Sequence, residues 1–277
     1  MADSIETING SVIQHGHHND RIYLMRLNLD DIETLLVKLD ELARDKGYGK
    51  VLARISSNAW PDFRTAGYRK EAVVPGFYRG RMDGLFVARY FSTHRQELPP
   101  IETRDTIRAI IDNKPPADST GTDRPQQPIV ACGPGDTDAM SAVYRRVFKS
   151  YPFPIHKPDY LNHVMKAGVS YYCIRAGDQI TALAATEIDW DCKVSEMTDF
   201  ATLPEWQKHG LADALLKHME SAVRKQEIRT AYTIARAASP GINRIFKNNG
   251  YHYAGLLKNN TQICGSIQSM TVWYKQF

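Results

Sequence analysis

The sequence has few cysteines, and no two of them are close together. The four are Cys132, Cys173, Cys192 and Cys264, and no C-x-x-C pair occurs among them. This spacing fits neither a structural zinc site, whose ligands come in closely spaced pairs, nor the disulfide framework of a small secreted domain. Reduced thiols packed in a core are therefore expected.

Long apolar runs and blocks of one charge are also missing. No stretch approaches the roughly 20 apolar residues that cross a bilayer, and no basic segment followed by an apolar one marks a signal peptide. The formal net charge is only +4 over 277 residues, without a block rich in Lys or Arg. We therefore expect a cytoplasmic protein that binds neither membranes nor nucleic acid.

Three histidines near the N-terminus, His15, His17 and His18, do not make a metal site by themselves. No carboxylate or cysteine pattern completes a set of ligands. Polar side chains are common just before a strand, so these histidines are expected to be solvated, and no metal is predicted.

One change of composition divides the chain. Residues 114–127 are rich in Pro, Ser, Thr and Gly and show no apolar periodicity, which is typical of a linker or a long surface loop. We place one domain at residues 1–113 and a second at 128–277. The content of apolar and charged residues is that of folded domains with a proper core.

The two halves show the same order of expected elements. Residues 193–277 read as a strand, an amphipathic helix, a strand, a short helix ending in Gly-Tyr, and two strands. Residues 21–91 repeat this order. The similarity is one of pattern and not of residues, and it indicates two related units, of which the N-terminal one is degenerate.

The strongest chemical signal lies where a strand ends at Pro204 and Gln207-x-x-Gly210-x-Ala212 opens a helix. Small residues let the backbone approach a ligand closely, and the first N–H groups of a helix have no partners inside it. Together with the helix dipole they form an anion site suited to a pyrophosphate. Alone, the string also fits an ordinary turn between a strand and a helix.

A second segment follows one strand later and contains N-x-x-F-x-x-x-G-Y from Asn243 onward. With both segments present in order and at suitable spacing, residues 128–277 resemble the GNAT superfamily of acetyl-CoA-dependent N-acetyltransferases. The resemblance implies an α/β (α+β) fold, in which helices flank a mixed, mostly antiparallel sheet. A smaller, degenerate GNAT-like domain precedes it here. It also implies an enzyme with acetyl-CoA as cosubstrate.

The same resemblance implies how CoA is held. The end of the strand pairs with the pantetheine arm, the loop amides hold the pyrophosphate, and Asn243 bonds to the cofactor. An Asn in this setting can equally make a local helix or turn bond. The expected cofactor-binding residues are Phe200, Ala201, Thr202, Gln207, Lys208, His209, Gly210, Leu211, Ala212, Asn243 and Phe246.

Further segments are similar to the beta-lysine N6-acetyltransferases within this superfamily. They are YPFPIH at 151–156, EMTDFATLP at 196–204, RIYLM at 21–25 and NAWPDFRTAGY at 58–68. The similarity therefore extends over nearly the whole chain. Those enzymes acetylate the terminal (N6) amine of beta-lysine and give N6-acetyl-beta-lysine, a compatible solute used in osmoadaptation. A polyamine or a protein lysine as acceptor, and a non-catalytic CoA-binding sensor, are the alternatives.

An amine with a pKa of about 10.4 is almost wholly protonated at neutral pH and lacks the lone pair that attacks a thioester, so the site needs a base. The strand before the CoA loop supplies Glu196 and Asp199. Because side chains alternate along a strand, the two carboxylates face opposite sides unless a bulge intervenes. We take Glu196 as the base and Asp199 as the second choice. A solvated or salt-bridged carboxylate explains either residue as well.

Attack on the thioester creates an oxyanion, which a backbone N–H near Ala201 is expected to stabilise. Many superfamily members have a tyrosine four residues before the glycine at position 250 as the acid for the thiolate, but this chain has Phe246 there. The candidates for the acid are therefore Tyr251, another tyrosine or water.

On the acceptor side, the resemblance points to a loop with Tyr151, Phe153 and His156, although ordinary loop packing explains these residues too. An acceptor carboxylate would need a cation, and the candidates near in sequence are Arg145, Arg146 and Arg175. The N-terminal domain has no Gly-rich helix start, so it is expected to bind no second CoA. A structural or dimerising role is expected for it instead, so a homodimer is among the expected partners.

Overall fold

The structure, a computed structural model, describes residues 3–113 and 128–277. Residues 114–127, the expected linker, lie outside the described residues. The helices and strands of the first part are β1 (Ser4–Ile8), β2 (Ser11–Gly16), β3 (Arg21–Arg26), α1 (Ile32–Lys46), β4 (Lys50–Ser56), α2 (Trp60–Thr65), β5 (Arg69–Tyr78), β6 (Met82–Tyr90) and α3 (Ile101–Asp112).

The second part begins at residue 128 and contains four helices. Its helices and strands are β7 (Ile129–Ala131), α4 (Thr137–Val147), α5 (Pro158–Lys166), β8 (Ser170–Ala176), β9 (Gln179–Asp189), β10 (Val194–Thr202), α6 (Leu211–Lys225), β11 (Thr230–Arg236), α7 (Pro240–Asn248), β12 (His252–Ile263) and β13 (Ser266–Gln276).

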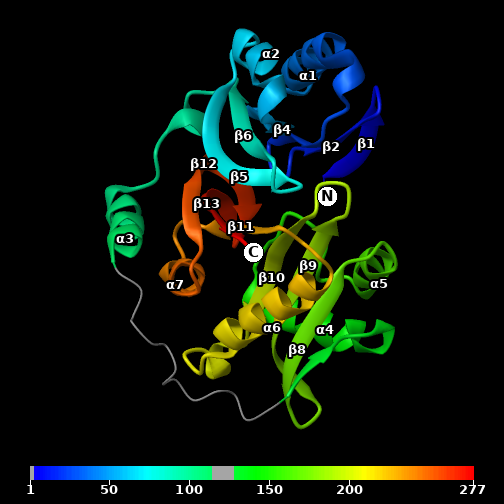
Figure 1. The fold of residues 1–277 in the computed structure, drawn as a ribbon, viewed down its shortest axis with the longest axis vertical. Helices are drawn as coiled ribbons and strands as arrows, with labels where there is room; N and C mark the ends of the chain where they lie inside the picture. Colours follow the sequence, from blue (N-terminus) through cyan, green and yellow to red (C-terminus); the bar gives the residue numbers. More distant parts are fainter. Residues whose placement is uncertain (1–2, 114–127) are drawn as a thin grey trace.

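The thirteen strands of the described residues belong to one sheet, in the order β1-β2-β3-β4-β6-β5-β12-β13-β11-β10-β9-β8-β7. Among the pairs of neighbouring strands in the described residues, β3–β4 and β10–β11 are parallel and the others are antiparallel. Helices pack on this sheet, with α1 and α2 over the first part and α4, α5 and α6 over the second (Figure 1). The expected mixed, mostly antiparallel sheet flanked by helices is confirmed.

The sheet order reads almost the same from both ends toward its middle. In the first part β3 pairs with β4, β4 with β6, and β6 with β5. In the second part β10 pairs with β11, β11 with β13, and β13 with β12. Each series starts with a parallel pair connected through a 15-residue helix, α1 or α6. The order of elements that the sequence predicted in both halves is therefore present.

The two series meet where β5 and β12 pair, with Ala72 opposite Gly255. Gly255 has a φ of +152°, which other residues rarely adopt, and a Cβ there would overlap the Glu71 carbonyl oxygen and the Ala72 backbone. A glycine is therefore needed for the two strands to come this close.

The core of the second part lies on both faces of the sheet. Alternate residues of β9 point to opposite sides, so Ala182 and Ala184 pack in the cluster with α6 while Leu183 and Ala185 pack in the cluster with α4. α6 presents a regular apolar stripe to the sheet, as its sequence predicts. This packing on both faces holds β9 in place beside β10.

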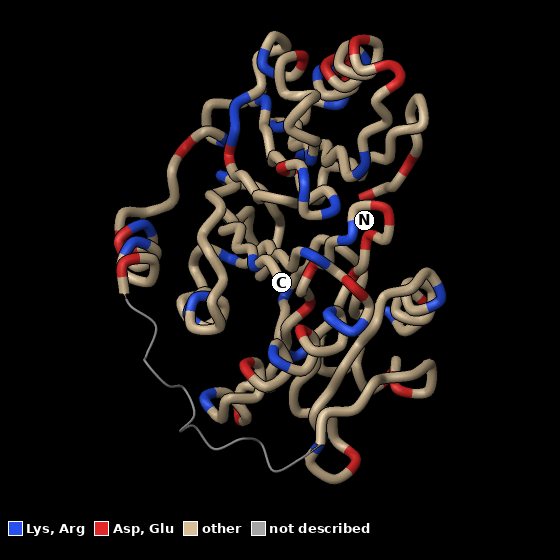
Figure 2. The backbone as a smooth tube through the Cα atoms, in the orientation of Figure 1, with Lys and Arg blue, Asp and Glu red and all other residues tan. Residues whose placement is uncertain are grey.

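Some elements were not predicted from the sequence. The hairpin β1–β2 turns at Asn9-Gly10, both with positive φ, which is a common hairpin signal. α3 packs against α7, far away in sequence. Acidic and basic residues are interspersed over the described part of the backbone (Figure 2).

Candidate active site

A cavity of about 810 Å³ lies where β10 and β11 separate. The two strands pair only from Val194 to Glu196 on β10. Further along, residues 198–200 and 202 of β10 and residues 233–236 of β11 line the cavity. Strand edges that no longer pair with each other offer backbone N–H and C=O groups to a ligand.

The loop after β10 borders the same cavity and leads into α6. Lys208 and Gly210 both have left-handed backbone conformations, and Gly210 is the N-cap of the helix. The N-terminus of a 15-residue helix thus opens onto the cavity, where its free N–H groups favour an anion. The expected cofactor-binding residues that line the cavity are Phe200, Thr202, Gln207, Lys208, Gly210, Leu211 and Ala212.

Four other residues expected to bind the cofactor have side chains elsewhere. The Ala201 side chain packs in the core with α4, and His209 is exposed beside Trp206. Asn243 is buried, and its amide nitrogen donates to the carbonyl oxygens of Arg236 (2.9 Å) and Ser239 (2.7 Å).

The Asn243 side-chain oxygen accepts from Thr271 Oγ1 (2.6 Å) and Trp273 Nε1 (2.8 Å). All the hydrogen-bonding capacity of this side chain is therefore used inside the protein, so the local bond is the alternative that the structure favours. Phe246 is fully buried and packs edge-on against Phe200 and Tyr251.

Tyr251, a candidate for the acid, is only 2% exposed and does not line the cavity. It packs with Phe246 and Trp273 in the core. Burial raises the pKa of its hydroxyl well above the ordinary value. Its position disfavours proton donation to a ligand in this cavity.

A bulge in β10 brings both candidate bases to the cavity. The register with β9 shifts between Thr198 and Ala201, and Asp199 has a φ of +55°. This extra residue overrides the alternation of side chains, so Glu196 and Asp199 both line the cavity.

Tyrosine hydroxyls hold Asp199 in place. Tyr151 donates to its carboxylate at 2.6 Å and Tyr171 at 3.2 Å, while Tyr144 donates to its backbone carbonyl oxygen at 3.2 Å. Asp199 is 8% exposed. Burial raises its pKa above the ordinary value, and the hydrogen bonds from Tyr151 and Tyr171 counteract this shift.

Glu196 accepts a hydrogen bond from Tyr232 at 2.7 Å, and the Arg54 guanidinium donates to the same hydroxyl at 3.2 Å. Burial raises the pKa of Glu196 to about 7, with the negative charge of Asp199 adding to the rise and Tyr232 and Arg54 opposing it. A carboxylate with a pKa near neutrality is well suited to accept a proton from an ammonium group.

A third carboxylate, Glu187 on β9, lies directly opposite Glu196 in the register. Its side chain is exposed, but this surface lines the cavity. Shielding by the surrounding protein and then the charges of Glu196 and Asp199 together raise its pKa to about 8, with Arg54 opposing the rise. Glu187 could not be identified from the sequence, because only the strand register brings it to the site.

The loop expected on the acceptor side is placed in part at the cavity. Tyr151 and Phe153 line it, together with Tyr160 from α5. His156 does not, since its side chain is exposed and its carbonyl oxygen accepts from Ser141 Oγ at 2.5 Å.

The three arginines proposed for an acceptor carboxylate lie outside the cavity. Arg146 pairs with Glu205 at 3.0 Å and Arg175 with Asp136 at 2.5 Å. Arg145 donates to a backbone carbonyl at 2.9 Å and is exposed. Nearness in sequence did not predict nearness to the cavity, because α4 and β8 point these side chains away from it.

The first part of the chain supplies one wall of the cavity. Its contributions come from neighbouring residues of the parallel strands β3 and β4, on the face turned toward the second part. They are Arg21, Tyr23, Met25, Leu52 and Arg54. Local sequence patterns could not reveal them, because the wall forms only when the two series share one sheet.

In residues 3–113 and 128–277, no group of three or more His, Cys, Asp or Glu side chains is arranged to hold a metal ion. His15 lies 3.0 Å from Glu6 and 3.1 Å from the Tyr48 hydroxyl. In the same described residues, every helix is too short or too polar to cross a membrane.

Known proteins match most of this chain. The model of the acetyltransferase (GNAT) family matches residues 138–251. Beta-lysine N(6)-acetyltransferase from Methanococcus maripaludis is 36% identical over 99% of this chain and 98% of its own. N-acetyltransferase YodP from Bacillus subtilis is 28% identical over 96% of both chains. Beta-lysine N(6)-acetyltransferase from Methanosarcina mazei is 24% identical over 87% of this chain and 96% of its own.

Among solved structures, the ribosomal-protein-S18-alanine N-acetyltransferase from Escherichia coli covers 55% of this chain and 94% of its own, with 16% identity and a TM-score of 0.48. Identity above 30% along almost the entire length of a known acetyltransferase decides the family. The chain belongs to the GNAT family and is an acetyl-CoA-dependent acetyltransferase.

Proposed function

We propose that this enzyme works in the cytoplasm and acetylates the terminal (N6) amine of beta-lysine to give N6-acetyl-beta-lysine, a compatible solute. One observation carries the proposal. The Methanococcus maripaludis relative, named for this activity, is 36% identical along 98% of its length. The aligned length therefore includes the first part of the chain, which supplies one wall of the cavity.

The cavity residues fit such a reaction. Acetyl-CoA supplies the activated acetyl group. Glu196 takes a proton from the N6 ammonium, so that the neutral amine attacks the thioester carbonyl. Tyr232 keeps the Glu196 carboxylate oriented through its 2.7 Å hydrogen bond. With Tyr251 buried outside the cavity, a cavity tyrosine or water protonates the departing thiolate.

The cofactor cradle is proposed on the residues that the geometry brings together. The edge of β10 at Phe200 and Thr202 is available to the pantetheine arm, and residues 207–212 present the α6 N-terminus to the pyrophosphate. Lys208 and Arg236 line the same cavity and add positive charge that suits phosphate groups.

We also propose the division into a degenerate GNAT-like domain at 1–113, a linker at 114–127 and a catalytic domain at 128–277. The matching strand pairing of the two series supports it.

The test is CoA release from acetyl-CoA with beta-lysine, L-lysine, L-ornithine, spermidine and a lysine-containing peptide as acceptors. We expect turnover confined to beta-lysine, with fragment masses that place the acetyl group on N6. Preferred turnover of spermidine or of the peptide contradicts the proposal. Tight binding of acetyl-CoA without turnover of any acceptor would point to a sensor.

A further inference from the structure

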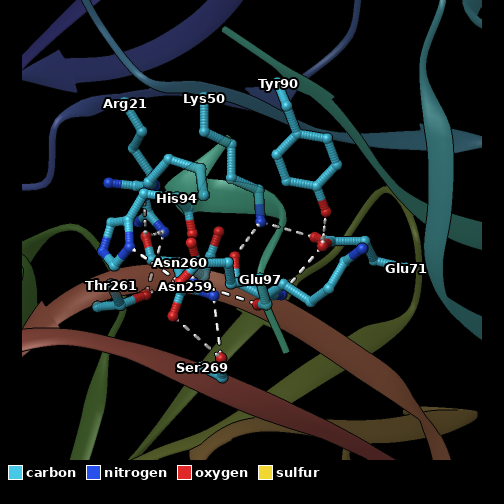
Figure 3. A network of polar contacts seen from close by, with 12 residues as sticks. Arg21, Lys50, Glu71, Tyr90, His94, Glu97, Asn259, Asn260, Thr261 and Ser269 are labelled. Carbon is cyan, nitrogen blue, oxygen red and sulfur yellow. Dashed lines mark hydrogen bonds and ion pairs between the residues drawn. The ribbon is translucent and has the colours of Figure 1, made fainter. Parts of the chain in front are cut away.

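Arg21, at the start of β3, is a buried arginine that lines the cavity without a carboxylate partner. The residue is 4% exposed. Its Nη1 atom donates to the Asn260 carbonyl oxygen at 2.6 Å and to Thr261 Oγ1 at 3.0 Å, both on β12 (Figure 3). The Nε–H has no hydrogen-bond partner in the described chain. Two neutral acceptors thus hold the guanidinium, and part of its donor capacity is unused.

The other buried cations around Arg21 are neutralised. Lys50 pairs with Glu71 at 2.7 Å, and Arg95 pairs with Asp20 at 3.2 Å. By contrast, no Asp or Glu of the described residues forms an ion pair with Arg21. Burial, and then the charge of Arg95, lower the pKa of Arg21 to about 10. The charges of Asp3 and Glu71 offset part of this lowering without forming an ion pair with the guanidinium. A buried charge without a direct ion pair is costly, and an anion in the cavity would lower that cost.

The acidic groups lie toward another part of the cavity wall. Tyr23 follows Arg21 by two residues and therefore faces the same side of β3. Burial raises the Tyr23 pKa to about 12, and the charges of both Arg21 and Glu196 act on it. The charge of Arg54 acts on it more strongly than either of these. The cavity thus has a cationic residue, Arg21, on β3 and carboxylates on β9 and β10, which suits an acceptor with a carboxylate and an amine.

We propose that Arg21 binds the carboxylate of the acceptor and thereby makes the enzyme select amino acids over diamines. The planar guanidinium matches a carboxylate in geometry and charge. Arg54, the other arginine on this wall, already contacts Tyr232 at 3.2 Å and Asp189 at 3.4 Å. The inference rests on the proposed function, because it assumes that the acceptor is an amino acid.

The experiment compares acceptors that differ only by the carboxylate: beta-lysine with pentane-1,4-diamine, L-lysine with pentane-1,5-diamine, and L-ornithine with butane-1,4-diamine. We expect Arg21→Gln to raise KM for beta-lysine and to lower kcat/KM by roughly 10- to 100-fold, the loss of a charge-assisted bond. Turnover of pentane-1,4-diamine should stay as in the wild type. Arg21→Lys, which keeps the charge but loses the planar fork, should give an intermediate KM.

Arg175→Gln is the matched control, because this arginine pairs with Asp136 outside the cavity. Thermal melting and acetyl-CoA binding report whether each variant folds. If Arg21→Gln does not fold, the KM of Arg21→Lys for beta-lysine tests the inference. Equal losses on beta-lysine and on the diamine, or an unchanged KM for beta-lysine, would overturn the inference.

The wild-type results separate the two proposals. If the wild type acetylates beta-lysine but the Arg21 variants show no selective loss, the proposed function stands and the inference fails. If it prefers another amino acid over the matching diamine and Arg21→Gln removes that preference, only the beta-lysine assignment fails. Turnover of diamines alone, or of no acceptor in the panel, contradicts both.

Discussion

At the scale of single residues, burial and charge set the chemistry of the Glu196 carboxylate. Glu196 lies in a cavity with Glu187 opposite and Asp199 at the bulge, and its pKa is raised to about 7. Below that pH the carboxyl holds its proton and cannot accept another. Above it, the ionised form is ready to take the proton from an ammonium group.

This pKa gives a prediction for the pH profile. We expect kcat/KM for the acceptor to rise with pH through about pH 7 and to level off above it. Glu196→Gln should lower kcat by about 100- to 10,000-fold and remove this limb. Steady-state kinetics from about pH 5.5 to about pH 9, in steps of about half a pH unit, would measure both effects.

Asp199→Asn serves as the comparison. Loss of the Asp199 charge should lower the pKa of Glu196 and move the limb to lower pH, because that charge contributes to the rise. If Asp199→Asn removes the limb while Glu196→Gln retains it, Asp199 is the base. Acetyl-CoA binding by both variants checks that the cofactor site is intact.

At the scale of elements, two local irregularities in strands build the site. The bulge between Thr198 and Ala201 turns Asp199 into the cavity, and the loss of pairing between β10 and β11 after Glu196 opens the space for the ligand. A third irregularity, Gly255 on β12, lets this strand reach β5 and so holds the cationic wall near the acids.

We expect Gly255→Ala to destabilise the protein by about 3 kcal/mol, since a side chain is strained at this φ and its Cβ overlaps backbone atoms of β5. Urea unfolding followed by circular dichroism measures the free energy. Gly177→Ala is the control: its φ is also positive, but no atom lies within 4 Å of the added Cβ. Its cost should be about 1 kcal/mol, and equal costs at both positions would contradict steric overlap at β5.

At the scale of the whole molecule, a buried polar network joins the two parts of the chain (Figure 3). Lys50 on β4 bonds to Glu71 and to the Lys258 carbonyl oxygen at 2.8 Å. Glu71 on β5 accepts from the Tyr90 hydroxyl and from the Lys258 N–H. The network joins β12 to β4 and β5 through Lys258. Asn260 and Thr261, further along β12, accept hydrogen bonds from Arg21, so the same strand contributes to stability and to the proposed acceptor site.

Removing one charge from this network should be costly. Glu71→Gln leaves the Lys50 ammonium buried without its counter-ion, and we expect a loss of about 3 kcal/mol in the free energy of unfolding. Urea titration measures it. Glu97→Gln is the matched control, because its pair with His94 is exposed and should contribute less than about 1 kcal/mol. A similarly small effect for Glu71→Gln would show that the buried Lys50–Glu71 pair contributes little to the free energy of unfolding.

The sequence by itself determined the family-level features. The apolar periodicity of β10, α6, β11 and α7 and the small residues at Gly210 and Ala212 depend on local backbone physics, so they could be predicted in order. The same local reasoning found Glu196 and Asp199, which lie on the strand that enters the CoA loop, while Tyr151 came from the family resemblance.

Only the tertiary structure decided which of these side chains meet. Glu187 reaches the site through strand register, Asp199 through a bulge, and Arg21 and Arg54 through a wall supplied by a part of the chain more than 100 residues away. Conversely, Tyr251 and Asn243 match a motif but are buried with the core. Local propensity fixes which elements form, while burial and pairing between distant strands fix which side chains face the substrate.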